Sequence, residues 1–241
     1  MSFLGFNNIK MLSVPVISVG GFKISGLKVF IGHKKLEKSI YKTTSVIMIS
    51  IRGTDPTQLS NLLADVNAYP YRWDTGLPFP TNNPLHKGPG AHGGFYFGVN
   101  EIWKILQADS DYSQYIDKGN ALFIVTGHSL GGALAELLSL KLRENHTSAN
   151  SIISYGFASP PVGNKELWKF ADEYDITCRI HKIMNEADKI PTLGFFAYTL
   201  ANNVVKFKDS RGNLLDNHSM ELVYLNYYLN LLGVYSRATV A

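Results

Sequence analysis

The sequence contains a single cysteine, Cys178, among its 241 residues. One cysteine forms no intrachain disulfide and builds no cysteine-based metal site, so packing and hydrogen bonds have to hold the fold. Long apolar runs are missing as well. No stretch of eighteen apolar residues occurs, which predicts that no helix spans a membrane. At this length we expect a sizeable core and one domain over residues 1–241.

The excess of positive over negative charge is also small. The formal net charge is +4, and the densest basic cluster, His33-Lys34-Lys35 followed by Lys38, has the composition of a solvated turn between two strands. A nucleic-acid-binding face needs more basic residues than this, so we expect no nucleic-acid partner. A weak attraction to anionic lipid surfaces is the most that this charge implies.

Two features of the sequence bear on the compartment. Residues 11–19 resemble a signal peptide in their hydrophobicity, but the single preceding charge, an internal proline and the lack of a clear cleavage triplet argue against one. Asn-x-Ser/Thr sites occur at Asn145 and Asn217, and a glycan on Asn217 would crowd the histidine that we assign to catalysis below. We therefore expect an intracellular, cytoplasmic location.

The sequence does contain a serine flanked by glycines, Gly127-His128-Ser129-Leu130-Gly131. An apolar run of strand length precedes it, and apolar residues at helical spacing follow it. Strand, glycine-flanked serine and helix form a nucleophile elbow, whose tight turn leaves room only for small flanking residues. The alternative is a glycine-rich turn that merely caps a helix, but the strand and the helix favour a catalytic serine. We expect a serine hydrolase with Ser129 as its nucleophile.

Strands and helices alternate along the rest of the chain. Apolar and β-branched runs predict strands at 22–30, 45–51, 121–125, 151–157 and 178–184. Helical periodicity predicts helices at about 92–106, 130–142 and 165–174. This alternation predicts an α/β fold with a mostly parallel central sheet and helices on both faces. In such a sheet the active site lies beyond the carboxyl ends of the strands.

The segment at about 55–91 has the character of a lid. Residues 55–58 have the composition of a helix start, and the helix expected at 56–66 carries four apolar residues on one face. Such a helix is either an ordinary surface helix or a lid over an apolar cleft. Residues 67–91 lack periodicity and are rich in Pro, Gly, Asn and Tyr, so we expect a loop that shapes one wall of the site.

A serine nucleophile needs a histidine base, which in α/β-hydrolases comes after the serine in the chain. Three histidines follow Ser129. His146 ends a helix far from the carboxyl edge of the sheet, and His181 lies in the middle of a predicted strand. His218 lies in a loop before an apolar helix, from which it reaches back over the sheet. We therefore assign His218 as the base.

The base in turn needs an acid that orients it and stabilises its cation. Asp188 follows the strand at 178–184 and so lies at the carboxyl edge of the sheet, where the acid is needed. Glu186 is its rival, and we favour Asp188. His86 and His92 form a conceivable metal pair, but no carboxylates accompany them, so we expect no metal site and take His92 as structural.

These segments together resemble the class 3, or fungal-type, lipase family over about residues 45–225. The resemblance rests on five motifs in the order of the family: Arg52-Gly53-Thr54, His92-Gly93-Gly94-Phe95, the stretch 126–135 around the serine, the stretch 156–164, and Asp188-Lys189-Ile190-Pro191. It implies an α/β-hydrolase fold with Ser129 as nucleophile, Asp188 as acid and His218 as base.

The same resemblance implies the rest of the site. The backbone N–H groups of Thr54 and Leu130 would form the oxyanion hole, Asp65 would steady the loop of Thr54, and the helix at 56–64 would be the lid. The implied activity is hydrolysis of acylglycerols or related lipid esters at a lipid–water interface, without a cofactor. The alternatives are a phospholipase A1 or galactolipase, a soluble carboxylesterase, and a non-catalytic scaffold on the same fold.

Overall fold

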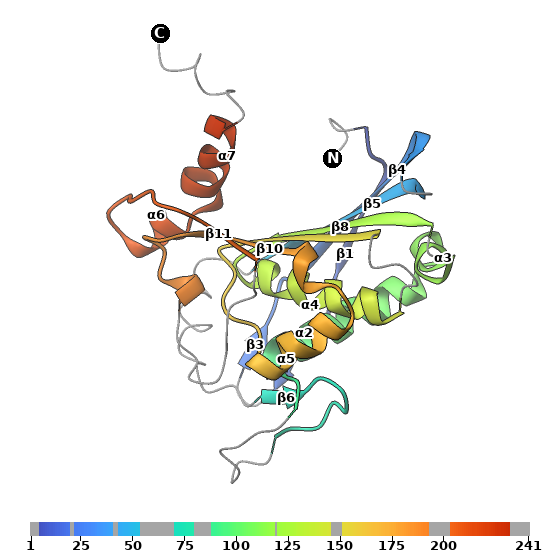
Figure 1. Cartoon of the computed structure of the whole chain (residues 1–241), viewed down its shortest axis with the longest axis horizontal. Coiled ribbons are helices and arrows are strands. Elements are labelled where there is room, and N and C mark those ends of the chain that lie inside the picture. Colours follow the sequence, from blue (N-terminus) through green and yellow to red (C-terminus); the bar gives the residue numbers. More distant parts are fainter. Residues whose placement is uncertain are drawn as a thin grey trace.

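A computed structural model of the chain describes residues 5–19, 22–40, 43–53, 70–79, 88–118, 120–145, 151–192 and 203–231 (Figure 1). Several expectations concern residues outside these ranges: those on Thr54, Asp65, His86, His146 and the helix at 56–66.

In the described part of the chain, seven strands form one sheet in the order β1-β4-β5-β8-β9-β10-β11. They are β1 (Asn7–Ser13), β4 (Lys28–Ile40), β5 (Thr43–Arg52), β8 (Ala121–His128), β9 (Ile152–Phe157), β10 (Ile180–Asn185) and β11 (Asn203–Phe207). Neighbouring strands from β5 to β11 are parallel, whereas β4 is antiparallel to both β1 and β5. Two small ribbons pair β2 (Ile17–Val19) with β3 (Phe22–Ile24) and β6 (Pro70–Arg72) with β7 (Gly90–His92).

The α-helices are α2 (Gly93–Ala108), α3 (Ser110–Lys118), α4 (Leu130–Asn145), α5 (Lys165–Glu173), α6 (Leu214–His218) and α7 (Asn226–Leu231). A π-helix, η5 (Met220–Leu225), joins α6 to α7, and η3 (Thr177–Arg179) and η4 (Ile190–Thr192) are short 3-10 turns. Helices α2, α4 and α5 lie on one face of the sheet, and α6 and α7 lie at its β11 end (Figure 1).

The two faces of the sheet are buried to different extents. Along β8, alternate residues such as Phe123 and Val125 are buried in the main core with α2 and α4, whereas Ile124 and Thr126 on the opposite face are only half-buried. That alternation is typical of a sheet with one face fully packed. On the second face, described helices pack only near β10 and β11, and this leaves space for a cavity beside them.

The predicted charged turn is wrong, because His33 lies inside the long strand β4. Lys34 pairs with Val46 and Lys35 with Ser45, and the His33 Nε2 atom lies 3.1 Å from the Ser45 Oγ atom. Side chains of a strand alternate between two faces, so a strand that is half solvated accommodates lysines as readily as a turn does. Of residues 11–19, the first three end β1 and the last three form β2.

The segment 67–91 also contains more structure than the expected loop, because β6 pairs with β7. Trp73 follows β6 and is buried, and its Nε1–H donates a hydrogen bond to Glu144 Oε1 (2.8 Å). The Lys141 ammonium lies 5.5 Å from the centroid of the indole ring. These contacts fasten the ribbon to the end of α4, which the residue spacing did not predict.

Candidate active site

Ser129 occupies the sharp turn between β8 and α4. Its φ of 57° is in the left-handed region, which costs a non-glycine residue about 1–2 kcal/mol. The Ser129 N–H donates to the carbonyl of Phe157 on β9 (2.9 Å), and this bond holds the strained turn against the sheet. A Cβ atom on Gly127 would overlap the backbone of Gly131, and one on Gly131 would overlap the carbonyl of Ile51. Both glycines are therefore required by the close approach of the chain.

Leu130 is the first residue of α4, so its N–H belongs to the helical turn that has no carbonyl partner within the helix. It follows Ser129 directly and lies at the positive end of the helix dipole. An N–H in this position is available to an oxyanion that forms on the serine. Thr54 lies outside the described residues, and the neighbouring Gly53 lines the same cavity as Ser129.

His218 and Asp188 form a buried pair. The His218 Nδ1 atom lies 2.8 Å from Asp188 Oδ2, and Asp188 is fully buried. The other oxygen, Oδ1, accepts the N–H of Ile190 (2.9 Å). Glu186, the rival acid, is exposed, and its N–H bonds the carbonyl of Phe207. The structure thus brings Asp188, and not Glu186, to the histidine.

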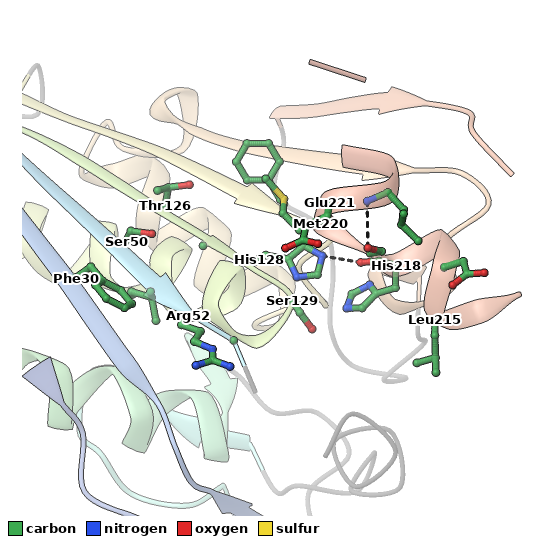
Figure 2. A pocket seen from close by; sticks show the side chains of 17 residues that line it. Phe30, Ser50, Arg52, Thr126, His128, Ser129, Leu215, His218, Met220 and Glu221 are labelled. Carbon is green, nitrogen blue, oxygen red and sulfur yellow. Dashed lines mark hydrogen bonds between the residues drawn. The ribbon is translucent and has the colours of Figure 1, made fainter. Parts of the chain in front are cut away.

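The second nitrogen of His218 is free to act as a base. Nδ1 donates its proton to Asp188, so Nε2 carries the lone pair of the neutral ring. Within the described ranges Nε2 is buried and has no hydrogen-bond partner. His218 and Ser129 line the same cavity (Figure 2). Catalytic hydrogen bonds often close only when substrate binds, so this is the arrangement expected before binding.

Tyr224 is a further member of the site that sequence reasoning missed. Its hydroxyl donates to Asp188 Oδ2 (2.8 Å), the same oxygen that receives the His218 proton, and accepts the N–H of Asn185 (3.0 Å). Burial and the adjacent Asp188 raise the pKa of Tyr224, so the hydroxyl remains a donor. Asp188 therefore accepts three hydrogen bonds, from His218, Tyr224 and the N–H of Ile190.

The π-helix η5 explains why periodicity does not reveal Tyr224. The N–H groups of Val223 and Tyr224 both point to the carbonyl of Ser219, at 3.2 and 3.5 Å. The wide turn lets the adjacent side chains of Val223 and Tyr224 both pack inward against Phe207 and Ile183. π-Helical turns occur frequently at functional sites.

We expect Tyr224→Phe to lower kcat about tenfold with KM unchanged, because Asp188 loses one donor and Asn185 N–H loses its acceptor. The free energy of unfolding should fall by about 1–3 kcal/mol, the usual cost of a buried unpaired group. Ester kinetics and urea denaturation measure the two effects. Tyr228→Phe, which removes a half-buried hydroxyl from α7, is the control. Equal kinetics in both variants would contradict a role for Tyr224 in the site.

The predicted loop at His218 is wrong, because His218 is the last residue of the short helix α6, which Asn185 and Asn217 hold in place. Asn185 Nδ2 donates to the carbonyls of Asp209 (2.6 Å) and Asn217 (3.3 Å), and Asn217 Oδ1 accepts the N–H of Arg211 (2.6 Å). Helix α6 is thereby tied to the end of β10. Asn217 is only 8% exposed, so little of its side chain is accessible to a glycosylating enzyme in the folded chain. This removes the glycosylation argument from the question of compartment.

His128 contacts the backbone of His218. The residue as a whole is partly exposed, but its imidazole ring is enclosed. The Nε2–H of the ring donates a hydrogen bond to the backbone carbonyl of His218 (2.7 Å; Figure 2). Burial, and secondarily the neighbouring His218, lower the pKa of His128 to about 3. The ring is therefore neutral at working pH and acts as a hydrogen-bond donor rather than as a second base.

Two enclosed histidines predict acid sensitivity. Burial lowers the pKa of His92 to about 4, and His92 stacks on Phe95 at 4.2 Å outside the cavity. His92 and His128 gain protons near pH 6.5 only when the chain unfolds, so stability is complete above that pH and falls as the pH drops toward 4. At pH 5 each of the two histidines should lower the free energy of unfolding by about 2 kcal/mol. Urea denaturation at pH 7 and pH 5 measures this loss of stability. In His92→Phe the loss between the two pH values should be smaller by about 2 kcal/mol, the contribution of one histidine. An unchanged loss would contradict the assignment.

A cavity of about 730 Å³ opens above Ser129 at the carboxyl edge of the sheet (Figure 2). Much of its wall is apolar, contributed by Phe30, Ile51, Phe157, Leu215, Met220 and Leu222. Among the described residues, the charged side chains on its wall are Arg52, Asp216 and Glu221. This is the size and lining typical of a pocket for a largely apolar ligand.

Within the described ranges, no three His, Cys, Asp or Glu side chains gather closely enough to hold a metal ion. The helices of the same ranges include none that is long and apolar enough to cross a bilayer.

Residues 48–198 match the sequence profile of the family described as Lipase (class 3). The lipase of Rhizomucor miehei is 33% identical over 126 residues, which are 50% of this chain and 33% of that protein. The secreted mono- and diacylglycerol lipase MDL2 of Malassezia globosa is 28% identical over 165 residues, 67% of this chain and 51% of that protein. The chain spans about half, or less, of the length of these relatives.

The fold has a counterpart among solved structures. M37 lipase superposes with a TM-score of 0.62 over 96% of this chain and 80% of that one, at 18% identity. That likeness establishes the α/β-hydrolase fold and its mostly parallel sheet, in agreement with the strand order found here. Since the family profile covers more than half of the sequence, the chain belongs to the class 3 lipase family.

Proposed function

We propose that the protein is a serine hydrolase of carboxylic esters, with Ser129 as nucleophile, His218 as general base and Asp188 as the acid that orients it. The observation that carries this proposal is the 2.8 Å bond from His218 Nδ1 to Asp188 Oδ2, which leaves Nε2 free in the cavity of Ser129. Nucleophile, base and orienting acid in this relation are the requirement for acyl transfer through a covalent intermediate.

The reaction has two steps. His218 Nε2 takes the proton of Ser129 Oγ as that oxygen attacks the ester carbonyl, and the imidazolium then gives this proton to the departing alcohol. Water attacks the resulting acyl-enzyme with His218 again as base, which releases the acid and restores the serine. Asp188 stays ionised throughout and stabilises the imidazolium, supported by the hydroxyl of Tyr224.

The negative charge on the tetrahedral intermediate needs donors close to Ser129. We propose the backbone N–H of Leu130 as one donor, because it starts α4 beside the serine. The resemblance to the family assigns the second donor to Thr54. Gly127, His128 and Gly131 shape the elbow that holds the Leu130 N–H in place.

An acyl chain fits the apolar wall of the cavity, so we propose acylglycerols or related lipid esters as substrates. The relative from Malassezia globosa is named as a mono- and diacylglycerol lipase, which supports this class. A phospholipase A1 or galactolipase would use the same residues on a different head group. Thin-layer analysis of products from acylglycerol, phospholipid and galactolipid substrates separates these possibilities, and a soluble carboxylesterase would cleave none of the long-chain lipids.

Action at a lipid–water interface predicts a particular rate curve. The rate on a short-chain triacylglycerol should rise sharply where its concentration passes the solubility limit, because a lid at 56–66 opens on the lipid surface. Ser129→Ala is the blank for this titration. A smooth saturating curve that the blank abolishes would contradict the lid and indicate an open-site esterase.

We also propose that residues 1–241 form one domain, because the main core joins residues from Val14 to Ile190. The relative from Malassezia globosa is named as a secreted lipase. This favours action outside the cell over the cytoplasmic location expected from the sequence, whose glycosylation argument the burial of Asn217 removes. Measuring ester hydrolysis in culture medium and in washed cells tests the compartment.

A further inference from the structure

A second polar cluster lies beneath the elbow, on the side of the sheet that faces α4. Lys182 of β10, Glu136 of α4 and Ser159, which follows β9, are all fully buried. The Lys182 ammonium donates to the carbonyl of Pro160 (3.0 Å) and lies 3.8 Å from Glu136 Oε1. The Ser159 hydroxyl donates to the same Glu136 oxygen.

This cluster does not resemble a second active site, because no member reaches solvent or the cavity. Burial raises the pKa of Glu136 and lowers the pKa of Lys182, and the attraction between the two opposes both shifts. A buried ion pair is often no more stabilising than apolar residues of the same volume. Its presence beneath the elbow therefore calls for a positional role.

The cluster holds a strained turn. Ala158 has a φ of 51°, a left-handed conformation that a non-glycine residue keeps only where its surroundings impose it. Its N–H donates to the carbonyl of Ile183 on β10 (2.9 Å). On the next two residues, Ser159 is held by Glu136 and Pro160 by Lys182. The turn is thus fixed from the helix on one side and from the strand on the other.

The strained turn is connected directly to the nucleophile. The carbonyl of Phe157, in the peptide that precedes Ala158, accepts the N–H of Ser129. Ser159 also packs so closely on α4 that a Cβ on Gly132 would lie 2.8 Å from the Ser159 Cβ. A rotation of the Phe157–Ala158 peptide would therefore release the backbone of Ser129 and turn the adjacent Leu130 N–H.

We propose that Glu136, Ser159 and Lys182 form a clamp that sets the backbone angle of the nucleophile elbow by holding Ala158 in its left-handed conformation. They are positioning residues, since none of them touches substrate. The inference rests on the proposed hydrolase function, and it places the determinants of Ser129 geometry on three elements behind the site: α4, the turn after β9, and β10.

The test compares two buried serine hydroxyls that contact α4. Ser159→Ala removes the bond to Glu136, whereas the control, Ser139→Ala, removes a bond within α4 to the carbonyl of Ala135 (2.8 Å). On a soluble ester, Ser159→Ala should lower kcat about tenfold with KM within about twofold, since small displacements far from the chemistry have effects of this order. Ser139→Ala should stay within about twofold of the parent. Equal kcat values in the two variants, both folded by circular dichroism, would overturn the proposal.

A rescue variant separates clamping from simple packing. Glycine adopts positive φ without strain, so Ala158→Gly added to Ser159→Ala should restore kcat to within about threefold of the parent. No restoration would overturn the role assigned to Ala158. Hydrogen exchange of the amides at 127–131 gives a reading independent of activity: it should be faster in Ser159→Ala than in Ser139→Ala. If the parent protein hydrolyses no ester, the hydrolase function fails, while the exchange rates still decide the clamp.

Discussion

Ser129→Ala is expected to lower kcat on p-nitrophenyl butyrate by about 10⁶, the loss seen when another serine hydrolase loses its nucleophile. Without Oγ no acyl-enzyme forms, and water attack aided only by the oxyanion donors remains. Ser129 is 5% exposed, and the substitution removes only a hydroxyl, so the fold should be unchanged. Initial rates and circular dichroism of the purified variant measure both outcomes.

The control for Ser129→Ala is Ser50→Ala, which removes a hydroxyl from the wall of the same cavity on β5. Its kcat should stay within about threefold of the parent, because surface-type substitutions away from the chemistry have small effects. A Ser129→Ala protein that keeps more than a hundredth of the parent kcat would exclude a covalent mechanism through this serine.

Asp188→Asn should lower kcat by about 10⁴, as the equivalent change does in another serine enzyme. Asn offers an N–H where Asp188 Oδ2 now accepts from both His218 and Tyr224. The imidazole would then carry its proton on Nε2, and it would no longer accept the proton of Ser129. KM should change little, since Asp188 does not line the cavity.

Two acids close to Asp188 in sequence or space serve as matched controls. Glu186→Gln changes the rival acid, which is exposed, and Asp216→Asn changes a carboxylate on the cavity wall two residues before His218. Both should keep kcat within about fivefold, the size of a lost surface interaction. A larger loss in Glu186→Gln than in Asp188→Asn would contradict the pairing found here.

The elbow and the proposed partners of Ser129 could be predicted from sequence because they depend on local patterns. A strand, a glycine-flanked serine and a helix identify the turn, and the acid and base follow from the rule that function gathers at the carboxyl edge of a parallel sheet. β8, α4 and the contact between His218 and Asp188 agree with those expectations. The sequence did not decide between Glu186 and Asp188, because both acids follow the same strand by a few residues. Their burial in the structure distinguishes them.

The supporting residues could not be predicted in the same way. Tyr224 reaches Asp188 through a π-helical turn, which shifts the register that periodicity assumes. Glu136 and Lys182 lie far apart in sequence on a helix and a strand that each look ordinary, and their pairing depends on sheet order. The turn predicted at His33–Lys38 was wrong because the prediction used charge alone. An antiparallel strand with one solvated face also accommodates charged residues.

The intact mass of the protein after incubation with an alkyl fluorophosphonate decides whether Ser129 is an activated nucleophile. The account predicts one adduct per chain, carried by the peptide that contains Ser129, and none in Ser129→Ala. It also predicts much slower labelling in Asp188→Asn, because His218 then no longer takes the serine proton. A parent protein that stays unmodified, or an adduct on any other residue, would contradict the account.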